Sequence, residues 1–361
     1  MFEFGYRRNL LNSPLSGWLD HMRWIAAFMV AASHIRNSLM WDAGPEMPAI
    51  AIPFYFMTLF AVESVDVFFV LSGLLVGGSI IRSLDSDRLS IRKYAFDRAT
   101  RLYVVLIPAI ILSSMIALLG TVDCATPDGA EIYIVNILFL QNFIAEPLCN
   151  NHPLWSLSSE AYFYIAGMAI IVGVYKRSFA TLFTSALLLL PAVFVFEWHR
   201  TTPLIGLTLW FAGLLPWFLK IRISWKWAIL PLLVMLVLSR IHLLSNDIIA
   251  HWLIALSLAI FLCSDFGTRK VAASKLAASL AGFSYSLYLV HMPIAQAVAS
   301  HIGLQSLRPN MIISYGIYFS VLGTAVTVAW LFGQVFENQT GKLRHLLKPV
   351  RTTSKIPPQK T

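Results

Sequence analysis

The chain has 361 residues, of which 58% are hydrophobic and only 12% are charged, and its mean hydropathy is +0.71. This composition excludes a soluble globular domain of that size and indicates a polytopic membrane protein. The net charge of +9 at pH 7 is carried by short loops and the C-terminal tail. We interpret it as the charge of a cytoplasmic membrane face, which argues against a nucleic-acid partner.

Apolar runs of about 20 residues can each cross the roughly 30 Å hydrocarbon core of a bilayer as a helix. Residues 131–147 are also apolar, but this segment is short and polar at both ends, so we interpret it as interfacial or re-entrant. The remaining runs predict an all-α bundle of about ten transmembrane helices at residues 17–40, 53–81, 99–120, 155–175, 179–197, 203–219, 227–241, 249–264, 278–303 and 311–336.

The distribution of basic residues orients these helices. With the N-terminus inside, 22 of the 27 Lys and Arg residues fall in inner loops or the tail. The positive-inside rule therefore predicts that both termini are cytoplasmic. We expect a transmembrane domain over residues 1–336 and a basic cytoplasmic tail over residues 337–361.

The first predicted span contains two ionisable residues, Arg23 and His34, in an otherwise apolar run. They are eleven residues apart, so they share one helix face and lie roughly 16 Å apart along the axis. Such a face suits a long molecule that enters from the cytoplasm and presents its reactive end deep in the membrane. The alternative is an arginine that snorkels to the headgroups and a histidine that bonds a neighbouring helix.

The second and third spans add acidic, small and basic residues. Asp66 lies among aromatic residues, and Ser72 and Gly73 follow it in a stretch that either permits close helix packing or opens a slot for a slender ligand. Arg98 and Arg101 are one turn apart at the start of the third span, where a pair of arginines can clamp phosphates. Ordinary positive-inside anchoring explains the pair equally well.

The fourth and ninth spans carry further polar residues at mid-membrane depth. Trp155 suits the outer interface, and Glu160 lies at about the depth of His34, where a carboxylate could orient an imidazole. Tyr285 and His291 predict a cavity in the ninth span, although aromatic packing and an interhelical hydrogen bond would also account for them. Ionisable groups inside spans require a partner or a cavity in every case.

Two of the three cysteines, Cys124 and Cys149, fall in the same long outer loop. If the outer side is an oxidising compartment, a disulfide between them would close that loop. The alternative is two unrelated free thiols.

Five stretches follow one another along the chain: LDHMRWIAAFMVAASH, DVFFVLSGLLVGGSI, DRATRLYVVLIP, PLWSLSSEAYFY and SYSLYLVHMPI. In this order they resemble the acyltransferase 3 family of integral-membrane acyltransferases, which includes bacterial polysaccharide and lipopolysaccharide O-acetyltransferases. The chain departs from the family pattern at Val104, where proline is common, and at Ala161, where the family often has Trp or Phe.

The resemblance implies an enzyme that transfers an acyl group, acetyl by default, from cytoplasmic acyl-CoA to a hydroxyl of a glycan or lipid-linked sugar at the outer face, without a metal. It also implies a multi-pass protein of the bacterial inner membrane that works beside envelope polysaccharide biosynthesis proteins. By position, Arg23 and His34 match the family's essential arginine and histidine, and Arg98 and Arg101 its Arg-x-x-Arg. Trp155, Ser156 and Glu160 match its Trp-Ser-Leu-x-x-Glu.

On this basis we expect His34 to be the general base, with Glu160 or Asp66 holding its tautomer. We expect acyl-CoA to contact Arg23, Ser72, Gly73, Arg98 and Arg101. We expect the acceptor to contact Trp155, Ser156, Tyr285 and His291. An acyl-histidine intermediate is the alternative to direct transfer. Two other functions stay open, a proton-coupled transporter or flippase and an intramembrane hydrolase.

Overall fold

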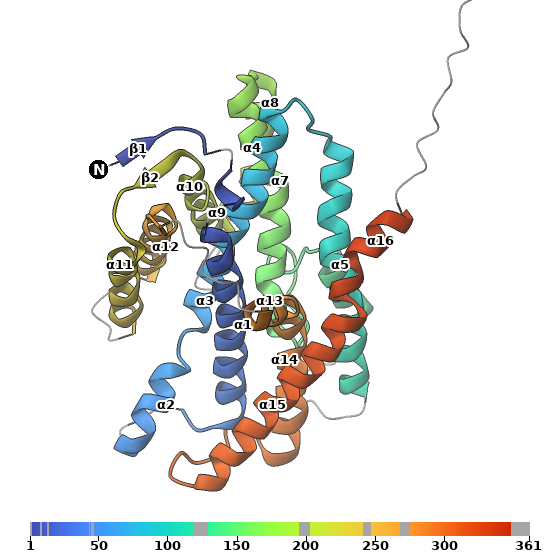
Figure 1. The fold of residues 1–361 in the computed structure, drawn as a ribbon. Coiled ribbons are helices and arrows are strands. Elements are labelled where there is room, and N and C mark those ends of the chain that lie inside the picture. The colour runs from blue at the N-terminus through green and yellow to red at the C-terminus, as the bar shows by residue number, and fades with distance from the viewer. Residues whose placement is uncertain are drawn as a thin grey trace, which may run out of the picture.

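The structure is a computed structural model that describes residues 2–7, 9–12, 14–42, 44, 47–118, 129–194, 203–240, 247–267 and 275–347. Within these residues nearly all regular structure is helical (Figure 1). The sheet found there is a single antiparallel pair that joins β1 (Phe2–Phe4) to β2 (Leu219–Ile221). The sequence did not predict this pair, which ties the N-terminal segment to a distant loop.

Four helical stretches in the described part of the chain are long and apolar enough to cross a membrane: Ala49–Asp85, Ile91–Leu118, His152–Lys176 and Ile312–Leu347. Shorter apolar helices cover Phe179–Leu189, Pro203–Phe218, Trp225–Leu238 and Ile248–Cys263. The structure thus agrees with an all-α membrane protein. The number of ten spans and the cytoplasmic termini stay predictions.

Helix α1 (Leu15–Leu39) lies at the centre of the bundle and packs against α3 (Ala61–Ser72), α13 (Lys275–Ala281), α14 (Ser284–Ile302) and α15 (Ile312–Val335) (Figure 1). Four alanines on its buried face, Ala26, Ala27, Ala31 and Ala32, let the neighbouring backbones approach closely. Its 25 residues span about 37 Å, enough to connect the two ends of the bundle.

We name these two ends by what they carry. The sheet end carries β1 and β2, and the opposite end, the hairpin end, carries the connection between α14 and α15 (Figure 1). There, the backbone N–H of Gln305 donates to the carbonyl of Ser38 at 3.0 Å, and that of Leu307 donates to Leu39 at 3.0 Å. The C-terminal end of α1 is therefore fixed to the hairpin end.

The predicted second span is interrupted. It comprises α2 (Ile52–Met57), α3, a π-helical turn over Gly73–Gly77 and α4 (Gly78–Asp85). A Cβ atom at Gly73 would lie 1.7 Å from the carbonyl oxygen of Trp210 in α9 (Pro203–Ala212). Gly73 therefore permits close packing of α3 on α9, and the geometry does not support the expected ligand slot at this residue.

The other elements complete the bundle around α1. Helix α6 has eight residues and a length of about 12 Å, so it is too short to cross a membrane, in agreement with the interpretation of residues 131–147. The elements that complete the bundle are η1 (Leu10–Asn12), η2 (Ala49–Ala51), α5 (Ile91–Leu118), α6 (Ala130–Ile137), η4 (His152–Leu154), α7 (Trp155–Lys176), α8 (Phe179–Phe194), α10 (Leu215–Phe218), α11 (Trp225–Leu238), α12 (Asp247–Cys263), η5 (Glu337–Gln339) and α16 (Thr340–Leu347).

Candidate active site

A cavity of about 340 Å³ lies inside the bundle between α1, α3, α4, α5, α7 and α14. We call it the inner cavity. It extends from Leu11 and Arg82 to Ser156 and Tyr288, and its lining combines apolar and polar side chains. The polar lining residues are Arg23, Ser72, Ser79, Arg82, Arg98, Arg101, Ser156, Glu160, Tyr164, Ser284, Tyr285 and Tyr288.

Two of the four arginines are held by aromatic rings. The guanidinium of Arg98 lies 5.7 Å from the ring centre of Tyr94 and 5.8 Å from that of Tyr164, and Arg82 lies 5.0 Å from the ring of Trp217. Stacking occupies the flat face of a guanidinium and leaves its in-plane N–H donors available. Indeed, Nε of Arg98 is buried and donates no hydrogen bond within the described part of the chain.

The remaining two arginines, Arg23 and Arg101, also line the inner cavity. Among the residues that the structure describes, Glu160 is the acidic residue of this lining. The cavity therefore has an excess of positive charge and several guanidinium donors. A polyanion with several phosphate groups is the kind of ligand that such a surface binds.

Glu160 is part of a hydrogen-bonded group that links three helices. Its Oε1 accepts from the hydroxyl of Tyr164, one turn along α7, and from Ser72 Oγ at 3.5 Å. Ser72 in turn accepts from Nε1 of Trp210 at 3.2 Å. These contacts fix the carboxylate on the wall of the inner cavity.

A second cavity, of about 450 Å³, lies at the hairpin end, and we call it the outer cavity. It is lined by His34, Asn37, Ser38, His152, Pro153, Met292, Gln296, Leu304 and Gln305. The arginine and histidine that share a face of α1 therefore lie on different cavities, with Arg23 on the inner one and His34 on the outer one.

A hydrogen-bonded wall lies between the two cavities. Ser156 and Tyr288 line the inner cavity, and their hydroxyl oxygens are 2.6 Å apart. The Tyr288 hydroxyl also donates to the carbonyl of Pro153 at 3.0 Å, and Pro153 lines the outer cavity. We call these three residues the partition.

His34 is held by another histidine. Its Nδ1 lies 2.9 Å from Nε2 of His291, and the two rings are stacked with centres 5.2 Å apart. Nδ1 of His291 lies 3.0 Å from the carbonyl oxygen of Leu287. Because a carbonyl can only accept, His291 must carry its proton on Nδ1, and its neutral form accepts at Nε2. His34 then donates from Nδ1, which leaves its Nε2 unprotonated.

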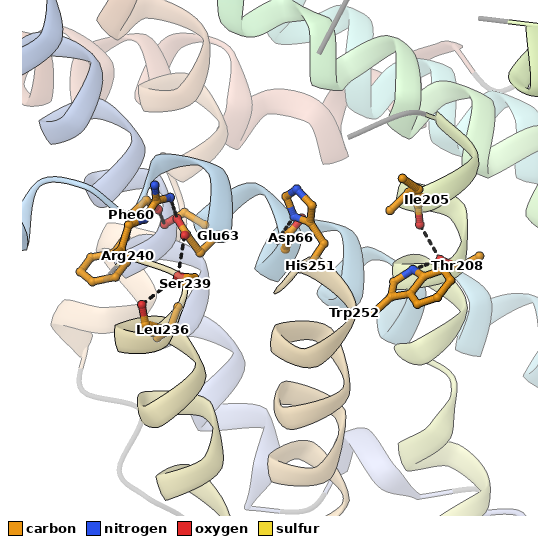
Figure 2. A network of polar contacts seen from close by, with 11 residues as sticks. Phe60, Glu63, Asp66, Ile205, Thr208, Leu236, Ser239, Arg240, His251 and Trp252 are labelled. Atoms are coloured by element: carbon orange, nitrogen blue, oxygen red, sulfur yellow. Dashed lines mark hydrogen bonds and ion pairs between the residues drawn. The ribbon is translucent and has the colours of Figure 1, made fainter. Parts of the chain in front are cut away.

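Asp66 takes part in a different group of contacts. Its Oδ2 lies 2.6 Å from Nδ1 of His251 in α12, and both side chains are buried. One turn earlier in α3, Glu63 pairs with Arg240 and accepts from Ser239 Oγ at 2.9 Å. Figure 2 shows these two groups along α3. They join α3 to the two residues that follow α11 and to α12 itself.

The comparison with protein families identifies this bundle. An acyltransferase-domain model, that of the acyltransferase 3 family, matches residues 16–334, which is most of the chain. The chain belongs to the acyltransferase 3 family. It is also 28% identical over 122 residues to an uncharacterized protein of Haemophilus influenzae, a match that covers 31% of this chain and half of the length of that relative. No solved structure matches the chain.

The matching family model is that of an acyltransferase domain. Four residues that match family motifs, Arg23, Arg98, Arg101 and Glu160, line the inner cavity together. Ser72 lines it too, and so do Ser156 and Tyr285, which were expected to contact the acceptor instead. The predicted residues of the donor site are thus brought together, except for Gly73.

The other predicted residues of this acyltransferase lie elsewhere. Asp66 pairs with His251 and Glu160 bonds Tyr164 and Ser72, so the hydrogen bond that orients His34 comes from His291 instead of the expected carboxylate. Both α3 and α14 pack against α1, but Asp66 of α3 bonds His251 of α12, whereas His291 of α14 lies against His34. Trp155 lies outside the lining of both cavities.

The predicted disulfide is only partly within the described structure. Cys149 is disulfide-bonded, whereas Cys124 lies outside the described residues. The pairing of these two cysteines therefore stays a prediction. Cys263 is free and buried.

The sequence did not predict Arg82 as a member of the inner cavity, or Asn37 and Gln296 as members of the outer one. A signal for Arg82 was present. Ser72, Val76 and Ser79 recur at helical spacing before it and share a face, so the periodicity of the second span extends to Arg82. Asn37 and Gln296 gave no such signal, because single amides near span ends are common.

Proposed function

We propose that this acyltransferase moves an acyl group, acetyl by default, from acyl-CoA bound in the inner cavity to a hydroxyl of a glycan or lipid-linked sugar in the outer cavity. The sheet end would face the cytoplasm and the hairpin end the outer side of the bacterial inner membrane. The observation that carries the proposal is the arrangement of two cavities on either side of one partition, one rich in arginine and the other containing a histidine with a defined free nitrogen.

The inner cavity suits the donor because acyl-CoA combines several phosphates with a long, slender thioester arm. Stacked Arg82 and Arg98 offer in-plane donors to phosphate oxygens, and Arg101 adds a third charge. Arg23 lies on the same face of α1 as His34 and would contact the arm between the phosphates and the thioester. In this role the four arginines hold and align the donor.

The chemical step follows from the tautomer of His34. Nε2 of His34 accepts the proton of the acceptor hydroxyl while the hydroxyl oxygen attacks the thioester carbonyl. The resulting tetrahedral oxyanion collapses, the carbon–sulfur bond breaks, and the ester forms. The leaving thiolate takes the proton back from the imidazolium, so the products are an O-acyl acceptor and CoA-SH. His291 accepts from Nδ1 of His34 throughout and keeps its ring in place.

The partition is where the two substrates would meet. The hydroxyls of Ser156 and Tyr288 are hydrogen-bond donors next to the boundary of both cavities. They could donate to the thioester oxygen as negative charge develops on it, provided that the thioester displaces their present contacts. Direct transfer at this point needs no acyl-histidine intermediate, although an acyl group on His34 would use the same cavities.

The experiment that tests the proposed function compares cell-surface glycans from bacteria with and without this protein by mass spectrometry. We expect glycans from cells that contain the protein to carry additional mass of one acetyl unit per modified site. A shift of a different acyl mass would correct the donor. Identical spectra for all glycan classes would contradict the proposal.

A further inference from the structure

The outer cavity, which contains the proposed catalytic histidine, has no acidic residue, lysine or arginine in its described lining. The polar groups are imidazoles, one hydroxyl and the amides of Asn37, Gln296 and Gln305. The lining therefore offers neutral hydrogen-bonding groups beside apolar contacts from Pro153 and Met292.

Hydrogen bonds to neighbouring charged residues fix the orientation of two of these amides. Asn37 Oδ1 accepts from Nε of Arg36 at 3.1 Å and also from its Nη2, and since arginine only donates, the amide NH₂ of Asn37 is the group that remains for a ligand. Gln305 Nε2 donates to Oδ2 of Asp42 at 3.3 Å, which leaves its carbonyl oxygen as an acceptor. The cavity thus presents a fixed donor and a fixed acceptor.

Three charged residues near this cavity, Arg36, Asp42 and Arg308, are not part of its lining. Arg36 is buried, bonds Asn37 and lies 5.0 Å from the ring centre of Tyr55. Arg308 lies 4.6 Å from the ring centre of Trp41. Asp42 accepts from Gln305. A charged ligand group that left water to enter the cavity would therefore lack a direct counter-charge, which is unfavourable.

We propose that the outer cavity is a binding site for an uncharged, hydroxyl-rich segment of the acceptor, a neutral sugar residue, and that it discriminates against a sugar that carries a carboxylate. The ligand would be recognised by the side-chain amides of Asn37, Gln296 and Gln305. Hydroxyl groups both donate and accept, so they match the fixed donor and the fixed acceptor of this lining. The assignment of this ligand as the acceptor rests on the proposed function, whereas the selection by charge rests on the lining alone.

The test measures sugar binding without acyl transfer. Purified full-length protein in lipid nanodiscs is titrated with methyl β-glucopyranoside and with methyl β-glucuronide, and binding is followed by saturation-transfer NMR. We expect the neutral glucoside to bind with a Kd about tenfold lower than that of the glucuronide. Gln296→Lys supplies a counter-charge inside the cavity and should remove this preference. The matched control Gln334→Lys, at an exposed position in α15, should retain it.

The inference is overturned if the glucuronide binds as tightly as the glucoside, or if neither sugar binds to the wild-type protein. It is also overturned if a folded Gln296→Lys variant keeps the wild-type preference. Should that variant fail to fold, the wild-type comparison decides. Selection of the neutral sugar without any acetylation of envelope glycans would contradict the proposed function alone, and acetylation without selection would contradict this inference alone.

Discussion

At the scale of single residues, His291 has the most specific proposed role, because its contact with His34 decides which nitrogen of His34 can act as the base. His291→Ala removes the acceptor for Nδ1 of His34, whereas His291→Gln keeps a side-chain oxygen there. We expect kcat to fall about a hundredfold in the alanine variant and less in the glutamine variant, with an unchanged KM for acetyl-CoA. Steady-state kinetics in nanodiscs measure both constants.

A purely structural role of His291 would give a different result. In that case both variants would lose folded protein, and the remaining folded molecules would turn over at the wild-type rate. Equal losses of kcat in the two variants would likewise contradict a positioning role, because only glutamine can still accept from His34.

Several site residues could be predicted at this scale and one essential contact could not. The family resemblance placed Arg23, Arg98 and Arg101 together at the donor, and all three line the inner cavity. Glu160 was expected beside His34 but lines the inner cavity instead. The partner of His34 was assigned to a carboxylate, since depth along a helix can be estimated from sequence but rotation toward a neighbour cannot. His291 is 257 residues away, and only the packing of α14 on α1 brings the two rings together.

At the scale of elements, the close approach of α3 to α9 depends on Gly73. A Cβ atom there would collide with the Trp210 backbone, which cannot move as freely as a side chain. We expect Gly73→Ala to destabilise the protein by about 1–3 kcal/mol and to lower its melting temperature. Thermal unfolding of the purified protein in detergent, followed by the fluorescence of its tryptophans, measures this change.

The matched control for this variant is Gly316→Ala in α15, where no atom lies within 4 Å of the position of the added Cβ. This change should leave the melting temperature unchanged or raise it slightly, since alanine favours helix. A Gly73→Ala variant as stable as the Gly316→Ala variant would mean that α3 and α9 are not packed as described.

The existence of most helices was predictable because long apolar runs must form helices in a bilayer. The places where these helices are interrupted were harder to predict. The second span divides into α2, α3, a π-helical turn and α4, and the turn lies where Trp210 and Trp217 pack against it. Such a break depends on residues more than 130 positions away, which hydropathy does not reveal.

At the scale of the whole molecule, the proposed function assigns the inner cavity to the donor and the outer cavity to the acceptor. Replacing both Arg98 and Arg101 by alanine removes two guanidinium groups from the inner cavity. We expect the KM for acetyl-CoA to rise at least about tenfold, because a hydrogen bond to a charged group contributes about 1.5–3 kcal/mol. Arg308→Ala, at the hairpin end, is the matched control and should leave this KM unchanged. An unaltered KM in the double variant would mean that the arginine pair only anchors the helix.

The central claim is that His34 is the base for acyl transfer between the two cavities. The most direct measurement follows the transfer of radiolabelled acetyl from acetyl-CoA to envelope glycans by the purified His34→Ala variant, together with its binding of acetyl-CoA. The matched control is His301→Ala, because His301 is an exposed histidine at the end of α14. The account predicts that His34→Ala loses transfer while it binds acetyl-CoA as the wild type does, and that His301→Ala retains both. Transfer at the wild-type rate by His34→Ala would contradict it.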